Sequence, residues 1–72
     1  MYEKKEVLEF FSNDHVFEDK DSVTVILPVK GMSEVPSIND QFKVGPFLLK
    51  CIYATEKFVA GYIFTHTTAP TL

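Results

Sequence analysis

The side chains with the widest chemical repertoire in this sequence are one cysteine, Cys51, and two histidines, His15 and His66. Metal sites usually draw such ligands from short motifs, such as C-x-x-C or H-x-x-x-H. These three residues are widely spaced and form no such motif. We therefore predict no metal site, and we interpret Cys51 as a buried structural residue, His15 as a turn residue and His66 as a strand-end residue.

Catalysis through a cysteine nucleophile would need Cys51 to meet His66. If both lie on paired strands, about five residues separate them, and a strand rises roughly 3.3 Å per residue, so they are too far apart. The three glycines stand alone at positions 31, 45 and 61, so there is no glycine-rich phosphate loop. We predict a protein that is not an enzyme and that carries no cofactor.

Lysines alternate with aromatic residues in the second half of the chain, a composition found in binders of single-stranded nucleic acid. In the alternative interpretation, the aromatic residues form the core and the lysines are solvated. The chain has no arginine, the side chain that forks onto phosphates and guanine edges, and its net charge is −3. Both properties disfavour duplex binding. The residues concerned are Lys43, Lys50 and Lys57, with Phe47, Tyr53, Phe58 and Tyr62.

Length and composition indicate one small globular domain, because 72 residues with 46% hydrophobic residues build a single marginal core. Residues 1–22 carry a charge of −4 and residues 23–72 a charge of +1. A lone cysteine inside an apolar run is typical of a reducing compartment, and no signal peptide or membrane-spanning run is recognisable. We expect a cytoplasmic protein without membrane contact.

Hydrophobic periodicity predicts one helix followed by short strands. Residues 3–11 place their apolar side chains on one side of a helical wheel, and residues 22–30 alternate with period two. Further strands are expected at 15–17, at 41–44 and in a hairpin formed by 47–54 and 58–67. We place a single domain at 1–67, with helix 3–11 and a β-rich part 15–67, and a frayed tail at 68–72.

The hairpin turn sets which side chains share a face. An even-length turn would pair Ala54 with Val59 and Cys51 with Tyr62. We prefer this register because it gathers most of the large aromatic side chains on one side. In either register both faces are mostly apolar, so we expect something to cover each of them.

The predicted fold is α+β and mainly β: a small curled antiparallel sheet or barrel of four to five strands, SH3-like or OB-like in size, with one short N-terminal helix. The expected function is that of a small, acidic, regulatory accessory protein that binds a larger protein, with an inhibitor-like role and a homodimer as further expectations. The alternative is a small barrel that binds single-stranded nucleic acid. The predicted partner-binding residues are an acidic run that steers a basic partner and an apolar patch on the second face: Glu18, Asp19, Asp21, Phe58, Val59 and Ile63.

Overall fold

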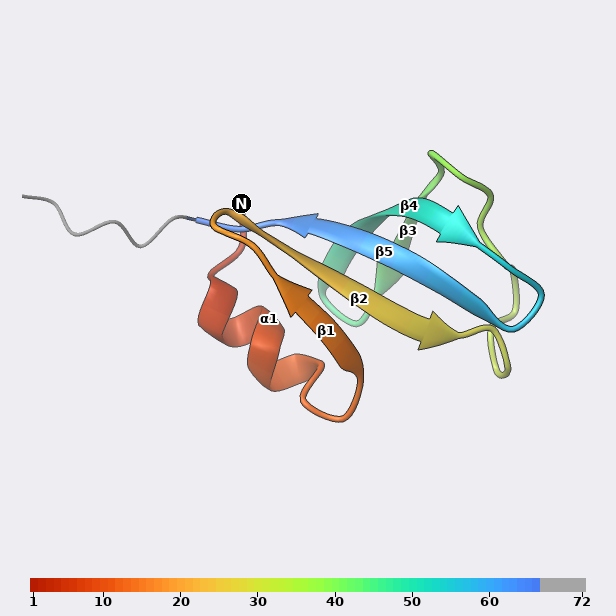
Figure 1. Cartoon of the computed structure of the whole chain (residues 1–72), viewed down its shortest axis with the longest axis horizontal. Coiled ribbons are helices and arrows are strands. Elements are labelled where there is room, and N and C mark those ends of the chain that lie inside the picture. The colour runs from red at the N-terminus through yellow and green to blue at the C-terminus, as the bar shows by residue number, and fades with distance from the viewer. Residues whose placement is uncertain (67–72) are drawn as a thin grey trace, which may run out of the picture.

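The computed structural model describes residues 1–66, and residues 67–72 lie outside the described part of the chain. One helix precedes five strands (Figure 1): α1 (Lys4–Phe10), β1 (His15–Glu18), β2 (Ser22–Pro28), β3 (Gln41–Val44), β4 (Phe47–Ala54) and β5 (Phe58–Phe64). This confirms the predicted mainly-β α+β fold with its short N-terminal helix. The helix and two strands end earlier than predicted, and the expected frayed tail lies outside the described residues.

All five strands belong to one antiparallel sheet with the order β1-β2-β5-β4-β3. The sheet curls, so that β3 lies behind the long β2–β5 pair in Figure 1. Within residues 1–66, β1 and β3 each have only one neighbouring strand and do not pair with each other. The fold is therefore an open, curled sheet and not a closed barrel.

The core lies on the side of the sheet that carries α1, which we call the inner face. Alternate residues of β2 (Val23, Val25 and Leu27) are buried here, as period two requires. The helix adds Val7, and the residue after it adds Phe11; both are essentially fully buried. A seven-residue helix is not stable alone in water, so this docking is what maintains it.

Two aromatic contacts hold the chain start and the β3–β4 turn against this core. The hydroxyl of Tyr2 accepts a hydrogen bond from the backbone N–H of Leu48 at 3.0 Å, and its ring packs edge-on against Phe47. Gly45, in the turn, has a φ of +57°, and a Cβ there would lie 2.3 Å from the Phe10 ring. Glycine therefore serves two needs at this turn: a left-handed backbone and close approach to the helix.

The hairpin register differs from the preferred prediction because of a β-bulge. Ala54 pairs with Val59 as predicted, but the register shifts between Cys51 and Tyr53, and Cys51 pairs with Gly61, not with Tyr62. The inserted residue brings the odd-numbered residues of β5 onto the inner face. The aromatic side chains predicted to share the face of Cys51 are consequently divided between the two sides of the sheet.

Gly61 explains why this register packs well. It is buried in the middle of the sheet, between Val25 and Cys51 in the strand pairing. A Cβ at Gly61 would lie 2.4 Å from Cδ2 of Leu49 and 3.0 Å from Cζ of Phe42. The absent side chain thus leaves the space that these two large residues fill.

Candidate binding surfaces

The side of the sheet opposite α1 has no described element packed over it; we call it the outer face. One register row crosses all five strands: Phe17, Thr24, Tyr62, Lys50 and Gln41. The bulge interrupts the alternation of side chains between the two faces, so the neighbouring residues Ile52 and Tyr53 are both exposed. The large hydrophobic side chains exposed on the outer face are Phe17, Leu48, Ile52, Tyr53, Phe58 and Phe64.

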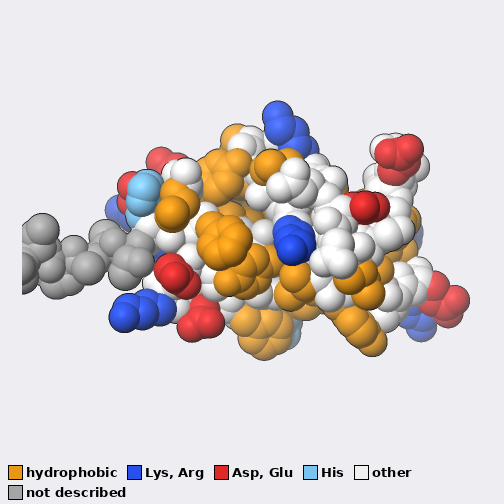
Figure 2. Space-filling model, turned by 90° about the horizontal axis from the view of Figure 1, so that it is seen from above, with side chains coloured by type: hydrophobic (Ala, Val, Ile, Leu, Met, Phe, Trp, Pro, Cys, Tyr) orange, Lys and Arg blue, Asp and Glu red, His pale blue; other side chains and the backbone are white. Residues whose placement is uncertain are grey.

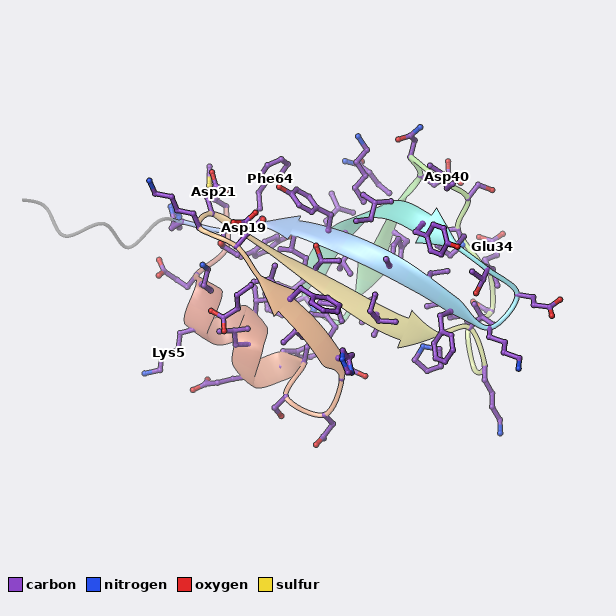
Figure 3. The ribbon with its side chains drawn as sticks, viewed as in Figure 1. Lys5, Asp19, Asp21, Glu34, Asp40 and Phe64 are labelled. Carbon is purple, nitrogen blue, oxygen red and sulfur yellow. The ribbon has the colours of Figure 1, made fainter. Side chains whose placement is uncertain are left out.

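Hydrophobic side chains gather over the middle of the molecule when it is seen from above, with lysine among them and carboxylates toward the two ends (Figure 2). Figure 3 shows Phe64 on the side away from the helix, with Asp19 and Asp21 near one end of the sheet and Glu34 and Asp40 near the other. Six exposed large hydrophobic side chains on one uncovered face favour a role in binding.

Of the predicted apolar patch, Phe58 alone is exposed. Val59 and Ile63 are both 0% exposed and belong to the core, where they pair with Leu27 and Val23. Assigning these two side chains to an accessible surface was wrong, because the bulge turns their side of β5 inward. The exposed residues of β5 are Phe58 and Phe64 at its two ends.

The predicted acidic run lies at the turn between β1 and β2, with all three side chains exposed. Lys4 donates to the backbone carbonyls of Asp19 and Lys20, and Asp21 accepts a backbone hydrogen bond from Thr65 at 2.9 Å. The turn is thus tied to the helix and to the end of β5. Glu18 pairs with Val23 and Asp19 follows it.

The acidic run and Phe58 do not form one surface. On the β2–β5 ladder, Ser22 pairs with Phe64 at one end and Pro28 with Phe58 at the other. Six strand steps of roughly 3.3 Å each separate these ends by about 20 Å. The structure therefore separates the predicted steering charges from the predicted patch.

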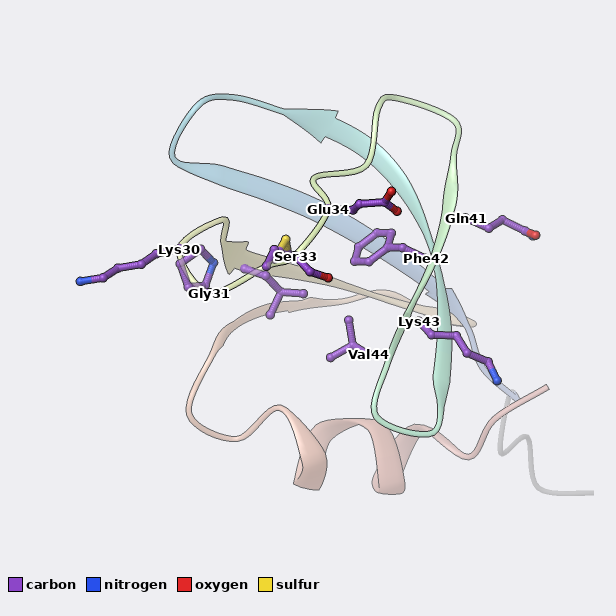
Figure 4. A pocket seen from close by; sticks show the side chains of 11 residues that line it. Lys30, Gly31, Ser33, Glu34, Gln41, Phe42, Lys43 and Val44 are labelled. Carbon is purple, nitrogen blue, oxygen red and sulfur yellow. The ribbon is translucent and has the colours of Figure 1, made fainter.

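A groove lies beside β3, on the open side of the curled sheet. Its volume is about 600 Å³, and all four residues of β3 line it, together with the end of β2 and the following loop. Figure 4 shows Phe42 and Val44 directed into this space, with Glu34 above it. Leu27 and Met32 extend the apolar lining, while Lys30, Glu34 and Lys43 supply charge of both signs at its margin.

The cysteine and the two histidines, which were the candidate metal ligands, do not form a site. Cys51 is a buried free thiol, as predicted, and its Sγ lies 3.5 Å from the carbonyl oxygen of Tyr53. His15 and His66 are exposed. Within residues 1–66, no three histidine, cysteine or carboxylate side chains come together as metal ligands would.

No family model, curated protein or solved structure was found to match this chain. In the described residues, no helix has both the length and the apolar character needed to cross a membrane. The surfaces themselves therefore carry the functional argument.

Sequence reasoning missed the groove and the composition of the outer face. The groove joins residues 27–34 to residues 41–44, segments with no shared pattern along the chain. For the outer face a signal was present: Val59, Ile63 and Thr65 are β-branched and flank a glycine at 61, whereas the aromatic residues occupy alternate positions. β-Branched side chains suit the tightly packed side of a sheet.

Proposed function

We propose that this chain is a small, non-enzymatic accessory protein that binds a larger protein by accepting an extended segment of that protein along β3. The observation that carries the proposal is the open edge of the sheet: β3 is a terminal strand in the sheet order, and the groove runs beside its whole length. Extended segments bind other proteins at such edges by adding a strand.

The backbone of β3 presents hydrogen-bonding groups in the direction a new strand would need. The N–H of Cys51 donates to the carbonyl of Asp40 at 2.8 Å, which fixes the phase of the antiparallel pattern. Because hydrogen-bonded and non-hydrogen-bonded positions alternate, Gln41 and Lys43 direct their backbone groups away from β4. A strand laid along β3 would pair with those two residues.

The groove supplies selectivity for the side chains of the bound segment. Phe42, Val44 and Met32 are half-buried, so apolar side chains of the segment would remove them further from water. Burial of apolar surface contributes roughly 25 cal/mol per Å². The charges of Lys30 and Glu34 at the margin favour a segment with both apolar and charged residues.

This mode of binding is consistent with a regulatory, inhibitor-like role, because a captured strand is withheld from its own protein. We place the protein in the cytoplasm, where the single thiol of Cys51 stays reduced. The same edge could pair with β3 of a second copy, so the homodimer expected from the sequence is an outcome that the experiment separates.

The test places a photo-cross-linking amino acid at Ser33, an exposed residue on the lip of the groove, in the full chain added to native host lysate. The matched control carries the same group at Lys5, on the exposed side of α1. We expect an adduct with one larger protein from position 33 alone. A Gln41→Pro change removes the outward N–H of β3 and should reduce the adduct, whereas Gln41→Ala should retain it.

Two results would contradict this proposal. One is an adduct that is equally strong from Lys5 and Ser33, and the other is an adduct that Gln41→Pro leaves unchanged. An adduct with the mass of two copies of this chain, together with a dimer in sedimentation equilibrium, would replace the larger partner with self-association.

A further inference from the structure

The outer face combines exposed aromatic rings with positive charge in a way that the proposed strand-binding groove does not use. Tyr62 stands opposite Lys50 in the register, and its ring meets the Phe64 ring edge-on with centroids 4.9 Å apart. Phe17 is 55% exposed and Tyr53 61% exposed. The Phe17 ring lies 5.5 Å from the His15 ring and Tyr62 is half-buried, so a molecule that approaches the sheet meets the exposed parts of these rings.

The charged side chains at outer-face strand positions are all basic. Lys50 stands in the central row, and Lys43 pairs with Leu48, two residues away from Lys50 on β4. His15 lies on the same face, because it pairs with Ile26 on β2 next to Phe17. Among the described strands, Glu18 is the one carboxylate, and it pairs with Val23, a residue of the inner face.

The remaining acidic residues are placed at the helix and at the turns, so the net charge of −3 is not the local charge of this face. The backbone carbonyl of Asp21 accepts a hydrogen bond from the backbone N–H of Thr65, which lies three residues beyond Tyr62. Three strand steps amount to about 10 Å, which is about one Debye length at 0.1 M salt. Salt therefore weakens the electrostatic effect of the acidic turn at the lysines in the centre of the face.

We propose that the outer face binds single-stranded nucleic acid, with bases stacked on Phe17, Tyr53 and Tyr62 and phosphates held by Lys43 and Lys50. Stacking needs open aromatic faces and is tolerant of sequence, and lysines supply the backbone contact. A duplex hides the faces of its bases, so single strands are the form that this surface selects. Five strands about 4.8 Å apart span about 19 Å, room for three or four nucleotides.

Because the sequence contains no arginine, we expect this site to bind single strands with little preference for their base sequence. Lysine contacts phosphate as a point charge and does not fork onto base edges, so the site has little means of reading sequence. Two phosphate contacts release few counterions, and for single strands the slope of log K against log salt is about −0.7 per contact. We therefore expect micromolar binding at 50 mM salt with a slope of about −1.4.

The experiment measures the fluorescence anisotropy of labelled dT12 with the full chain, across a salt series. Lys50→Gln should weaken binding and bring the slope to about −0.7, while Lys5→Gln makes the same charge change on α1 and should leave both unchanged. Tyr62→Leu should weaken binding roughly 5- to 140-fold through lost stacking, while Phe10→Leu, which changes an exposed aromatic residue on the helix side, should not. Phe17→Leu repeats the stacking test on an edge strand.

Each contrary outcome is decisive. The proposal is overturned by absence of binding at 50 mM salt, by a duplex of the same length binding as tightly, or by variants that weaken binding no more than their controls. Equal displacement of dT12 by poly-glutamate would identify the face as a site for acidic proteins instead. Tyr62→Leu and Phe17→Leu change residues that do not line the groove, so they should leave the cross-linked adduct from Ser33 unchanged, and this site and the strand-binding edge fail or succeed separately.

Discussion

Replacing Thr65 with valine should make the protein more stable. Thr65 follows β5 and forms an isolated parallel bridge with Tyr2. Its backbone N–H donates to the carbonyl of Asp21 at 2.9 Å, so this backbone donor is satisfied. Its side-chain hydroxyl is not: the residue is 1% exposed, and the buried Oγ1 has no hydrogen-bond partner within residues 1–66.

The expected gain follows from the free energy of leaving a buried polar group unpaired, which is about 1–3 kcal/mol. Valine has nearly the same shape, with a methyl group in the place of the hydroxyl, so it removes this penalty without opening a cavity. We expect the free energy of unfolding to rise by about 1–2 kcal/mol. For a domain of this size, each kcal/mol raises Tm by roughly 4–8 °C.

The assay is urea denaturation followed by circular dichroism, with Thr65→Ser as the matched control. Serine keeps the unpaired hydroxyl and loses a buried methyl group, so it should lower stability by about 1 kcal/mol. The expected order of stability is therefore valine, then threonine, then serine. If valine is less stable than threonine while serine matches it, the hydroxyl has a partner and this reasoning is refuted.

Three further predictions test the packing. Gly45→Ala should lower the free energy of unfolding by about 1–3 kcal/mol, because it strains the left-handed turn and meets the Phe10 ring. Adding Phe10→Ala should recover the steric part of this loss, and equal losses in both backgrounds would argue against that contact. Val59→Asp should abolish cooperative unfolding because it buries a charge in the core, whereas Phe58→Asp should leave a protein that circular dichroism shows to be folded. A folded Val59→Asp variant would contradict the observed register. Cys51 should react with a thiol reagent only as fast as the protein opens, so its labelling rate should rise with urea, and rapid labelling in buffer would disprove burial.

The sequence predicted the elements well because their signals are local. The alternation of Val23, Val25 and Leu27 identifies β2, and the apolar side of residues 3–11 identifies the helix that docks on it. The existence of a turn between Ala54 and Phe58 was also evident, and the pairing of Ala54 with Val59 is confirmed. Each of these depends on neighbouring residues alone.

The register of β4 against β5 was not predictable in the same way, because both alternating sets in these strands are apolar. A single inserted residue at the bulge decides which set faces the core, and it does so by packing Leu49 and Phe42 into the space beside Gly61. That contact joins three strands, so no local pattern encodes it. The candidate surfaces carried the same error: Val59 and Ile63 were assigned to an accessible surface, and Tyr62 was paired with the buried Cys51.

The strand order also bears on how the protein reaches its fold. β5 is the last of the five strands along the chain, yet it lies at the centre of the sheet and joins β2 to β4. The β1–β2 and β3–β4 hairpins can therefore form early, but each keeps an apolar side uncovered until β5 inserts between them. The pairing of β2 with β5 is distant in sequence, and such pairing is slower to form than local contacts. During synthesis, the two half-sheets must wait for the strand that unites them, and in that interval they are most exposed to aggregation.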